Sequence, residues 1–330
     1  MAVSWAPSRE PDEGVRHEGR MSSPKFAVLS DGRRLAYSEY GAADGWPVLA
    51  LHGTPGSRLK YAPADPVARA LGLRLVSVDR WGYGGTPPHP APSLGAFGAA
   101  CGALLDHFGA ETAGVVGISG GGPFAVAAGC VLGPRITRLA LVAPVGQIAG
   151  AKLGWRALNP LHAFAFRVLP WIPGGVRGAF APFRQIALAA PASSVTVATL
   201  RAAPADRRLM RHRALRRSLG ACFAEGLRRD ARGPEIDLRI FCRRWDVELD
   251  RLTCASKVWI GSADRNVPIP AAVALARRLS NCTLDVMPDA GHFWIAQNFD
   301  VVLRWLAERD AENLPRGRTA HEVTKPFLGE

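Results

Sequence analysis

The sequence predicts an α/β fold, with a mostly parallel twisted sheet, helices on both faces and an inserted helical cap. Short apolar segments of strand length alternate with helical patterns over residues 25–146 and again over residues 236–312. Such alternation implies right-handed crossovers, which place helices on both faces of a parallel sheet. Residues 147–235 show no strand pattern and are broken repeatedly by proline, so we expect them to form the cap.

The first part of the chain is predicted to contain a hairpin and four further strands. Residues 26–30 and 33–40 are strand-like and flank Asp31-Gly32, a dipeptide that favours a two-residue hairpin loop. The remaining predicted strands of this part are residues 47–51, 73–78, 113–118 and 138–143, with helices at 94–108 and 124–132. In the second part, strands are predicted at 256–260 and 283–287, and helices at 271–279 and 293–308.

The two ends of the chain lack the apolar periodicity of a packed element. Residues 1–24 are predicted to be a disordered extension and residues 313–330 a flexible tail, and Met21 is an alternative start. The chain contains no apolar run of the roughly 18 residues that a spanning helix needs. Its first residues also lack the basic-then-apolar pattern of an export signal. We therefore expect a soluble, cytoplasmic protein.

Positive charge is concentrated in one segment. The 330 residues carry a net charge of +13, and residues 147–232 contain fifteen Lys or Arg and three acids, a net of +12. This distribution argues against a uniformly basic coat for nucleic acid. The strongly basic stretch 207–217 is either a solvated helical face or a weak contact for an anionic membrane surface or an acidic substrate. The six cysteines contain no C-x-x-C pair and are expected to be free thiols rather than zinc ligands or disulfides.

Ser119 lies in the pentapeptide Gly117 to Gly121, where a buried strand runs directly into a helix. A turn this sharp requires strained backbone, with a positive φ expected at its tip, and such strain is usually retained at functional positions. Glycines at 117 and 121 remove side chains that would collide as the strand and helix cross. Ser119 is therefore the candidate nucleophile.

A reactive serine needs a neighbouring base and a third group that orients the base. His292 follows the last predicted strand, and Asp264 follows the strand before it. Because the carboxyl ends of parallel strands converge on one edge of a sheet, we expect these two side chains to meet Ser119 there. Asp289, Asp246 and Asp250 are the rival acids; Asp289 is expected to shape the turn before His292.

Backbone N–H groups are the expected stabilisers of a developing oxyanion. Gly120 N–H lies at the start of the helix after Ser119, and Thr54 N–H follows another predicted strand. We expect His52 and Gly53 to support this oxyanion loop. Asp79 is expected to hold the glycine-rich turn 79–86 through backbone hydrogen bonds.

Together these motifs resemble the α/β-hydrolase-fold serine hydrolases of the esterase, lipase and aminopeptidase-like group. The resemblance covers about residues 26–306. Residues 52–56 resemble the family's oxyanion loop, 79–86 its D-x-x-G-x-G-x-S turn with Thr86 in place of serine, and 117–121 its nucleophile elbow. Asp264 matches the acid and His292 the base. A serine at position 119 argues against the epoxide-hydrolase and dehalogenase branches, which place aspartate there.

The resemblance implies a hydrolase without metal or cofactor that cleaves an ester, thioester or similar acyl bond of a small molecule. Amide or iminopeptide cleavage, carbon–carbon bond hydrolysis and cofactor-free perhydrolysis share the same triad and stay open. A ligand-binding receptor and a basic membrane-surface binder are alternatives from other classes. The aromatic residues of the cap suit either a roof over an acyl group or simple packing of the cap; they are Trp155, Phe164, Phe166, Trp171, Phe180 and Phe183.

Overall fold

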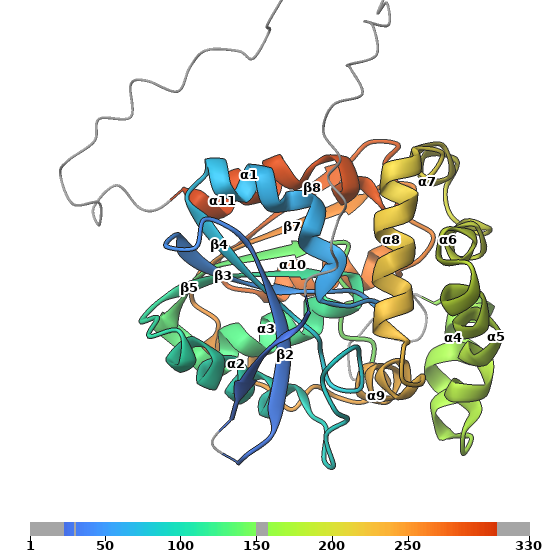
Figure 1. Ribbon diagram of the computed structural model, residues 1–330, viewed down its shortest axis with the longest axis horizontal. Coiled ribbons are helices and arrows are strands. Elements are labelled where there is room, and N and C mark those ends of the chain that lie inside the picture. The colour runs from blue at the N-terminus through green and yellow to red at the C-terminus, as the bar shows by residue number, and fades with distance from the viewer. Residues whose placement is uncertain (1–22, 30, 150–157, 309–330) are drawn as a thin grey trace, which may run out of the picture.

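An eight-stranded sheet forms the centre of the computed structural model, which describes residues 23–29, 31–149 and 158–308 (Figure 1). The strand order is β1-β2-β4-β3-β5-β6-β7-β8, and every neighbouring pair from β4 onward is parallel. β1 and β2 are antiparallel, as are β2 and β4. The strands are β1 (Lys25–Val28), β2 (Arg34–Gly41), β3 (Trp46–Leu51), β4 (Leu73–Val78), β5 (Ala113–Ile118), β6 (Ile136–Val142), β7 (Ala255–Gly261) and β8 (Cys282–Met287).

Helices cover both faces of the sheet, as the alternating pattern predicted (Figure 1). One apolar core joins the sheet to α2 (Leu94–His107), α3 (Gly122–Leu132) and α10 (Ile269–Arg278). A second core, on the other face, joins it to α1 (Asp65–Ala70) and α11 (Phe299–Ala307). The buried strands read as continuous apolar runs because both of their faces are covered.

A group of helices follows β6 and lies beside one end of the sheet (Figure 1). They are α4 (Pro160–Arg167), η5 (Leu169–Trp171), α5 (Gly175–Ala189), α6 (Pro191–Thr199), α7 (Pro204–Leu209) and α8 (Arg213–Gly226). Their own apolar cluster includes Val195, Leu219 and Phe223, together with Phe293 from the loop after β8. We call α4 to α8 the cap helices. The next helix, α9 (Arg232–Phe241), packs into the first core, so the boundary expected after residue 235 falls inside it.

Three local predictions differ from the structure. The connection between β1 and β2 is longer than Asp31-Gly32, because β1 ends at Val28, β2 begins at Arg34, and Leu29 N–H donates to Arg33 O. The expected helix 293–308 is divided into η7 (Trp294–Gln297) and α11. A helical segment after β3, η1 (Arg58–Ala64), has no counterpart among the predicted elements. Trp155, residues 1–22 of the predicted extension 1–24, and the whole of the predicted tail 313–330 lie outside the described residues.

No helix in the described ranges combines the length and the apolar character that crossing a membrane requires.

Candidate active site

Ser119 occupies the turn between β5 and α3, at the first position of a short helical turn, η2 (Ser119–Gly121). Its φ is +54°, so the predicted positive φ is confirmed. Side chains at the flanking glycines would not fit: a Cβ on Gly117 would lie 2.7 Å from Ala125 Cβ, and one on Gly121 would collide with Leu51 O. The elbow therefore needs both glycines, and it holds the Ser119 side chain at the carboxyl end of the sheet.

His292 and Asp264 meet Ser119 at this edge, as predicted from their places after β8 and β7. His292 Nε2 lies 3.1 Å from Ser119 Oγ, and His292 Nδ1 lies 2.8 Å from Asp264 Oδ2. Asp264 Oδ1 accepts hydrogen bonds from Asn266 N and Val267 N, at 2.7 and 3.1 Å. The acid is therefore oriented by its own loop, and all three side chains are buried.

The rival acids lie elsewhere. Asp289 is exposed, with a φ of +54°, and its N–H donates to Ser262 Oγ, which fits a role in the turn. Asp246 accepts hydrogen bonds from Leu94 N and Gly95 N at the start of α2.

Burial and charge act in opposite directions on the titrating pair. Burial works to lower the pKa of His292, but the Asp264 carboxylate outweighs it, so that this pKa is raised above its ordinary value. Burial likewise works to raise the pKa of Asp264, and His292 with the two backbone donors outweighs it, so that this pKa is lowered. The pair thus favours an ionised Asp264 beside a histidine that readily accepts a proton.

Asp206 is a second carboxylate at the site, and it comes from cap helix α7. It is 1% exposed, and its two oxygens accept hydrogen bonds from His292 N at 2.9 Å and Phe293 N at 2.8 Å. A side chain at Gly291 would collide with this carboxylate. Asp206 therefore fixes the backbone that carries His292, and its negative charge helps to raise the pKa of that histidine. The sequence analysis missed Asp206, whose neighbours Arg207 and Arg208 are typical of a solvated helix.

The predicted oxyanion loop lies against the elbow. A Cβ on Gly53 would lie 3.2 Å from Ser119 Cβ, and one on Gly120 would collide with Thr54 Oγ1. His52 is fully buried and accepts a hydrogen bond at Nε2 from Arg80 N, at 3.1 Å, while Nδ1 lies 2.8 Å from Gly53 O. Burial and the nearby Arg80 guanidinium hold the pKa of His52 well below its usual range, so His52 supports the loop as a neutral ring.

A buried ion pair holds the same loop from the side of α9. Asp237 pairs with both terminal nitrogens of Arg80 and accepts hydrogen bonds from Tyr83 Oη, at 2.6 Å, and from Thr54 Oγ1. Arg80 Nε in turn donates to His52 O at 3.1 Å. Neither Arg80 nor Asp237 appeared as a site residue in the sequence, because they are separated by 157 positions.

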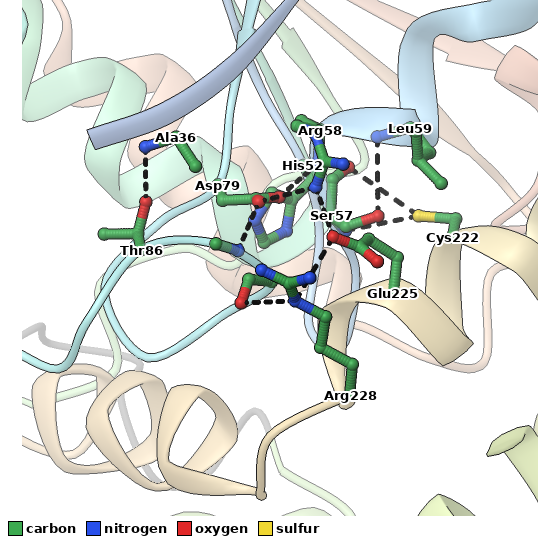
Figure 2. A network of polar contacts seen from close by, with 12 residues as sticks. Ala36, His52, Ser57, Arg58, Leu59, Asp79, Thr86, Cys222, Glu225 and Arg228 are labelled. Atoms are coloured by element: carbon green, nitrogen blue, oxygen red, sulfur yellow. Dashed lines mark hydrogen bonds and ion pairs between the residues drawn. The ribbon is translucent and has the colours of Figure 1, made fainter. Parts of the chain in front are cut away.

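A second buried network joins the glycine-rich turn to cap helix α8 (Figure 2). Asp79 accepts hydrogen bonds from Gly85 N at 2.8 Å and Arg58 N at 2.7 Å, which confirms its predicted role in the turn. The Arg58 guanidinium bridges Asp79 and Glu225 of α8. Ser57 N–H donates to Cys222 Sγ, also on α8, at 3.3 Å (Figure 2). The cap helices therefore contact both the oxyanion loop and the histidine loop.

Two cavities meet at Ser119 and His292. The larger has a volume of about 850 Å³ and the smaller about 220 Å³, and Thr54 and Phe180 line both. Among the cap aromatics, Phe166 lines the larger cavity and Phe183 the smaller. Phe164 and Trp171 are instead 48% and 59% exposed, so only part of the aromatic set lines the cavities. Within the described residues, no three His, Cys, Asp or Glu side chains are grouped so that they could hold a metal ion.

Comparison with known proteins identifies a matching family and several solved structures with a similar fold. A family model described as the alpha/beta hydrolase family matches residues 48–305. An alpha/beta hydrolase fold protein from Nakamurella multipartita is 25% identical, with a TM-score of 0.63 over 87% of this chain and 98% of that one. An esterase from Thermogutta terrifontis is 19% identical, with a TM-score of 0.59 over 87% and 97%. An enol-lactonase from Burkholderia xenovorans is 16% identical, with a TM-score of 0.61 over 85% and 97%.

Proposed function

The chain belongs to the alpha/beta hydrolase family, and on this basis we propose that it is a metal-independent serine hydrolase that cleaves an ester, thioester or related acyl bond. One observation carries the proposal. Ser119 Oγ, the His292 ring and the Asp264 carboxylate form a continuous chain of contacts at 3.1 and 2.8 Å, with the serine on a strained elbow. Strain at such a position is normally retained only where it serves function.

The proposed reaction begins with attack of Ser119 Oγ on the substrate carbonyl carbon. His292 Nε2 takes the hydroxyl proton and then delivers it to the leaving group, while Asp264 holds the ring through Nδ1 and stabilises its charged form. Gly120 N–H and Thr54 N–H are proposed to stabilise the oxyanion. Water activated by His292 then attacks the acyl-enzyme, releases the acid and restores Ser119.

Two contacts of the Thr54 hydroxyl support the proposed role of Thr54 N–H as an oxyanion donor. Its hydroxyl is engaged by Asp237 and lies next to Gly120, so the loop is held while Ser119 reacts. A preorganised donor of this kind typically contributes about 2.7–4 kcal/mol to transition-state stabilisation.

Fluorophosphonate labelling tests the proposal. The wild-type protein should be labelled and should hydrolyse short para-nitrophenyl esters. Ser119→Ala should lose labelling and lower kcat by at least about 10³-fold. Ser193→Ala, which changes an exposed serine on α6, is the matched control. Absence of labelling and of turnover in the wild-type protein would favour a ligand-binding, receptor-like role.

Other reactions of the same triad are kept as alternatives. The solved structures that resemble this chain include an enol-lactonase and a bromoperoxidase from Bacillus anthracis. Lactone opening is acyl transfer to water and needs no further group. Perhydrolysis differs only in that hydrogen peroxide replaces water in the second step, so a peroxide-dependent change of product distinguishes it. Amide, iminopeptide and carbon–carbon substrates complete the panel.

We also propose a weak contact of the cap with anionic membrane surfaces. Large apolar side chains are exposed along α4 and η5, among them Phe164 and Trp171. The Arg243 guanidinium lies 5.5 Å from the Trp171 ring centroid. Exposed apolar groups beside cations are typical of surfaces that bind the headgroup region of a bilayer.

A further inference from the structure

Among the residues that the structure describes, Lys60 is the one lysine or arginine that lines the smaller cavity. It lies on η1, and the same cavity is lined by Ser119 and His292. Apart from His292, the other described lining residues are glycine, proline, neutral polar or apolar, and no carboxylate is among them. Apolar residues from the cap helices form one side; they are Phe180, Phe183, Ala198, Leu219 and Phe223. A group bound in this cavity would therefore contact Ser119 and His292, and it would be surrounded mainly by apolar side chains together with the Lys60 ammonium.

Lys60 has no acidic partner within the described part of the chain. The buried cations near it are different: Arg58 pairs with Asp79 and Glu225, and Arg80 with Asp237. Burial lowers the pKa of the Lys60 ammonium, and only the Cys222 thiol opposes this effect. An ammonium among apolar side chains without a counter-ion is unfavourable, and an anionic ligand would remove that cost.

The volume of the smaller cavity limits what this ligand can be. At about 220 Å³ it is below the roughly 300–1,000 Å³ of sites for drug-sized ligands. The larger cavity, about 850 Å³, has room for a bulkier leaving group. This difference in size favours a short chain in the smaller cavity, with its carbonyl carbon at Ser119 and its far end toward Lys60.

We propose that Lys60 binds the terminal carboxylate of the substrate, and that the substrates are esters or thioesters of short dicarboxylic acids. This inference rests on the proposed serine hydrolase function. Lys60 acts in it as a specificity-determining residue: it contacts the distant carboxylate and takes no part in proton transfer. Its charge is matched by the substrate rather than by another residue of the protein.

Two esters of equal chain length test the proposal. They are the mono-para-nitrophenyl ester of adipic acid and para-nitrophenyl hexanoate, which differ in the terminal carboxylate. The measured quantity is the ratio of kcat/KM for the anionic ester to that for the neutral ester. Lys60→Met should lower this ratio at least tenfold. Lys25→Met is the control, because Lys25 is exposed on β1 and pairs with Glu39, and it should leave the ratio within about twofold of the wild-type value.

The outcomes separate this inference from the function on which it rests. Hydrolysis of both esters with a ratio that Lys60→Met does not change would overturn the role of Lys60 alone. No labelling by fluorophosphonate and no turnover of either ester would overturn both proposals. If Lys60→Met fails to fold, measurements on the wild-type protein decide. A kcat/KM for the anionic ester below about one tenth of that for the neutral ester would contradict a cavity that favours a carboxylate. Competitive inhibition by adipate but not by hexanoate would support such a cavity.

Discussion

Asp206→Asn is the most informative substitution in the histidine loop. The carboxylate accepts hydrogen bonds from His292 N and Phe293 N. A hydrogen bond to a charged acceptor contributes about 1.5–3 kcal/mol. Asparagine keeps one acceptor oxygen, so one of the two N–H groups would face an amide NH₂ and lose its partner. We expect the loss of this hydrogen bond to raise the activation free energy of the step in which His292 acts by about 1–3 kcal/mol, which corresponds to a fall in kcat of about 5- to 150-fold.

The form of the defect distinguishes positioning of His292 from a general loss of stability. Asp206 lines neither cavity, so KM should change little while kcat falls. Its negative charge also helps to raise the pKa of His292, so the acidic limb of the kcat/KM profile should move to lower pH in the variant. Loss of folded protein alone would also lower the apparent kcat at constant KM, but it would not move this limb, so the shift of the limb is the distinguishing result.

The assay is ester hydrolysis across the acidic and neutral pH range, with the rate of fluorophosphonate labelling as a second readout. Asp230→Asn is the matched control, because it removes the same charge from the segment after α8, where Asp230 pairs with Arg232. Thermal unfolding of each variant reports whether the fold is retained. An Asp206→Asn protein with wild-type kcat and an unmoved acidic limb would refute the positioning role.

Three further predictions concern other parts of the site. Ester hydrolysis should slow as the pH falls through the raised pKa of His292, because the protonated ring cannot accept the serine proton. Lys60→Met removes a cation that lowers this pKa, so the variant's acidic limb should lie at higher pH. A shift of the limb to lower pH would contradict the charge assignment. Asp237→Ala should lower the free energy of unfolding by about 3–5 kcal/mol in urea titrations, because Arg80 is left buried and unpaired; a loss below about 1 kcal/mol would show that Arg80 finds other partners. In vesicle flotation, binding to anionic vesicles should weaken with salt and with Trp171→Ser, and salt-insensitive binding or none would refute the membrane contact.

The sheet and the three residues at its edge could be predicted because their signals are local. Strands such as β3 and β5 are buried on both faces over most of their length, so their sequences are continuous apolar runs that end where the chain turns. Ser119 follows β5 directly, Asp264 lies in the loop after β7, and His292 lies in the loop after the edge strand β8. Parallel strands bring their carboxyl ends to one edge, so the order of the strands was not needed to bring these residues together.

Predictions were weaker where the backbone is irregular. The hairpin loop and the division of the closing helix into η7 and α11 depend on individual hydrogen bonds, such as Leu29 N–H to Arg33 O, that apolar periodicity does not report. The η1 segment has the composition of a loop, and it follows β3 as a helix because Ser57 caps its first turn.

The sequence by itself determined the fold class, the elbow at Ser119 and the choice of Asp264 and His292 as its partners. Each of these depends on a local pattern, either an apolar run of strand length or the placement of glycines in a turn. Only the tertiary structure decided which other charges serve the site. Asp206 reaches the histidine loop from 86 positions away, and Asp237 reaches Arg80 across 157. In the sequence, a buried aspartate and a solvated one look alike. Their difference is set by how the cap helices and α9 pack against the edge of the sheet, and that packing also leaves Lys60 facing the cavity without an acidic partner in the described part of the chain.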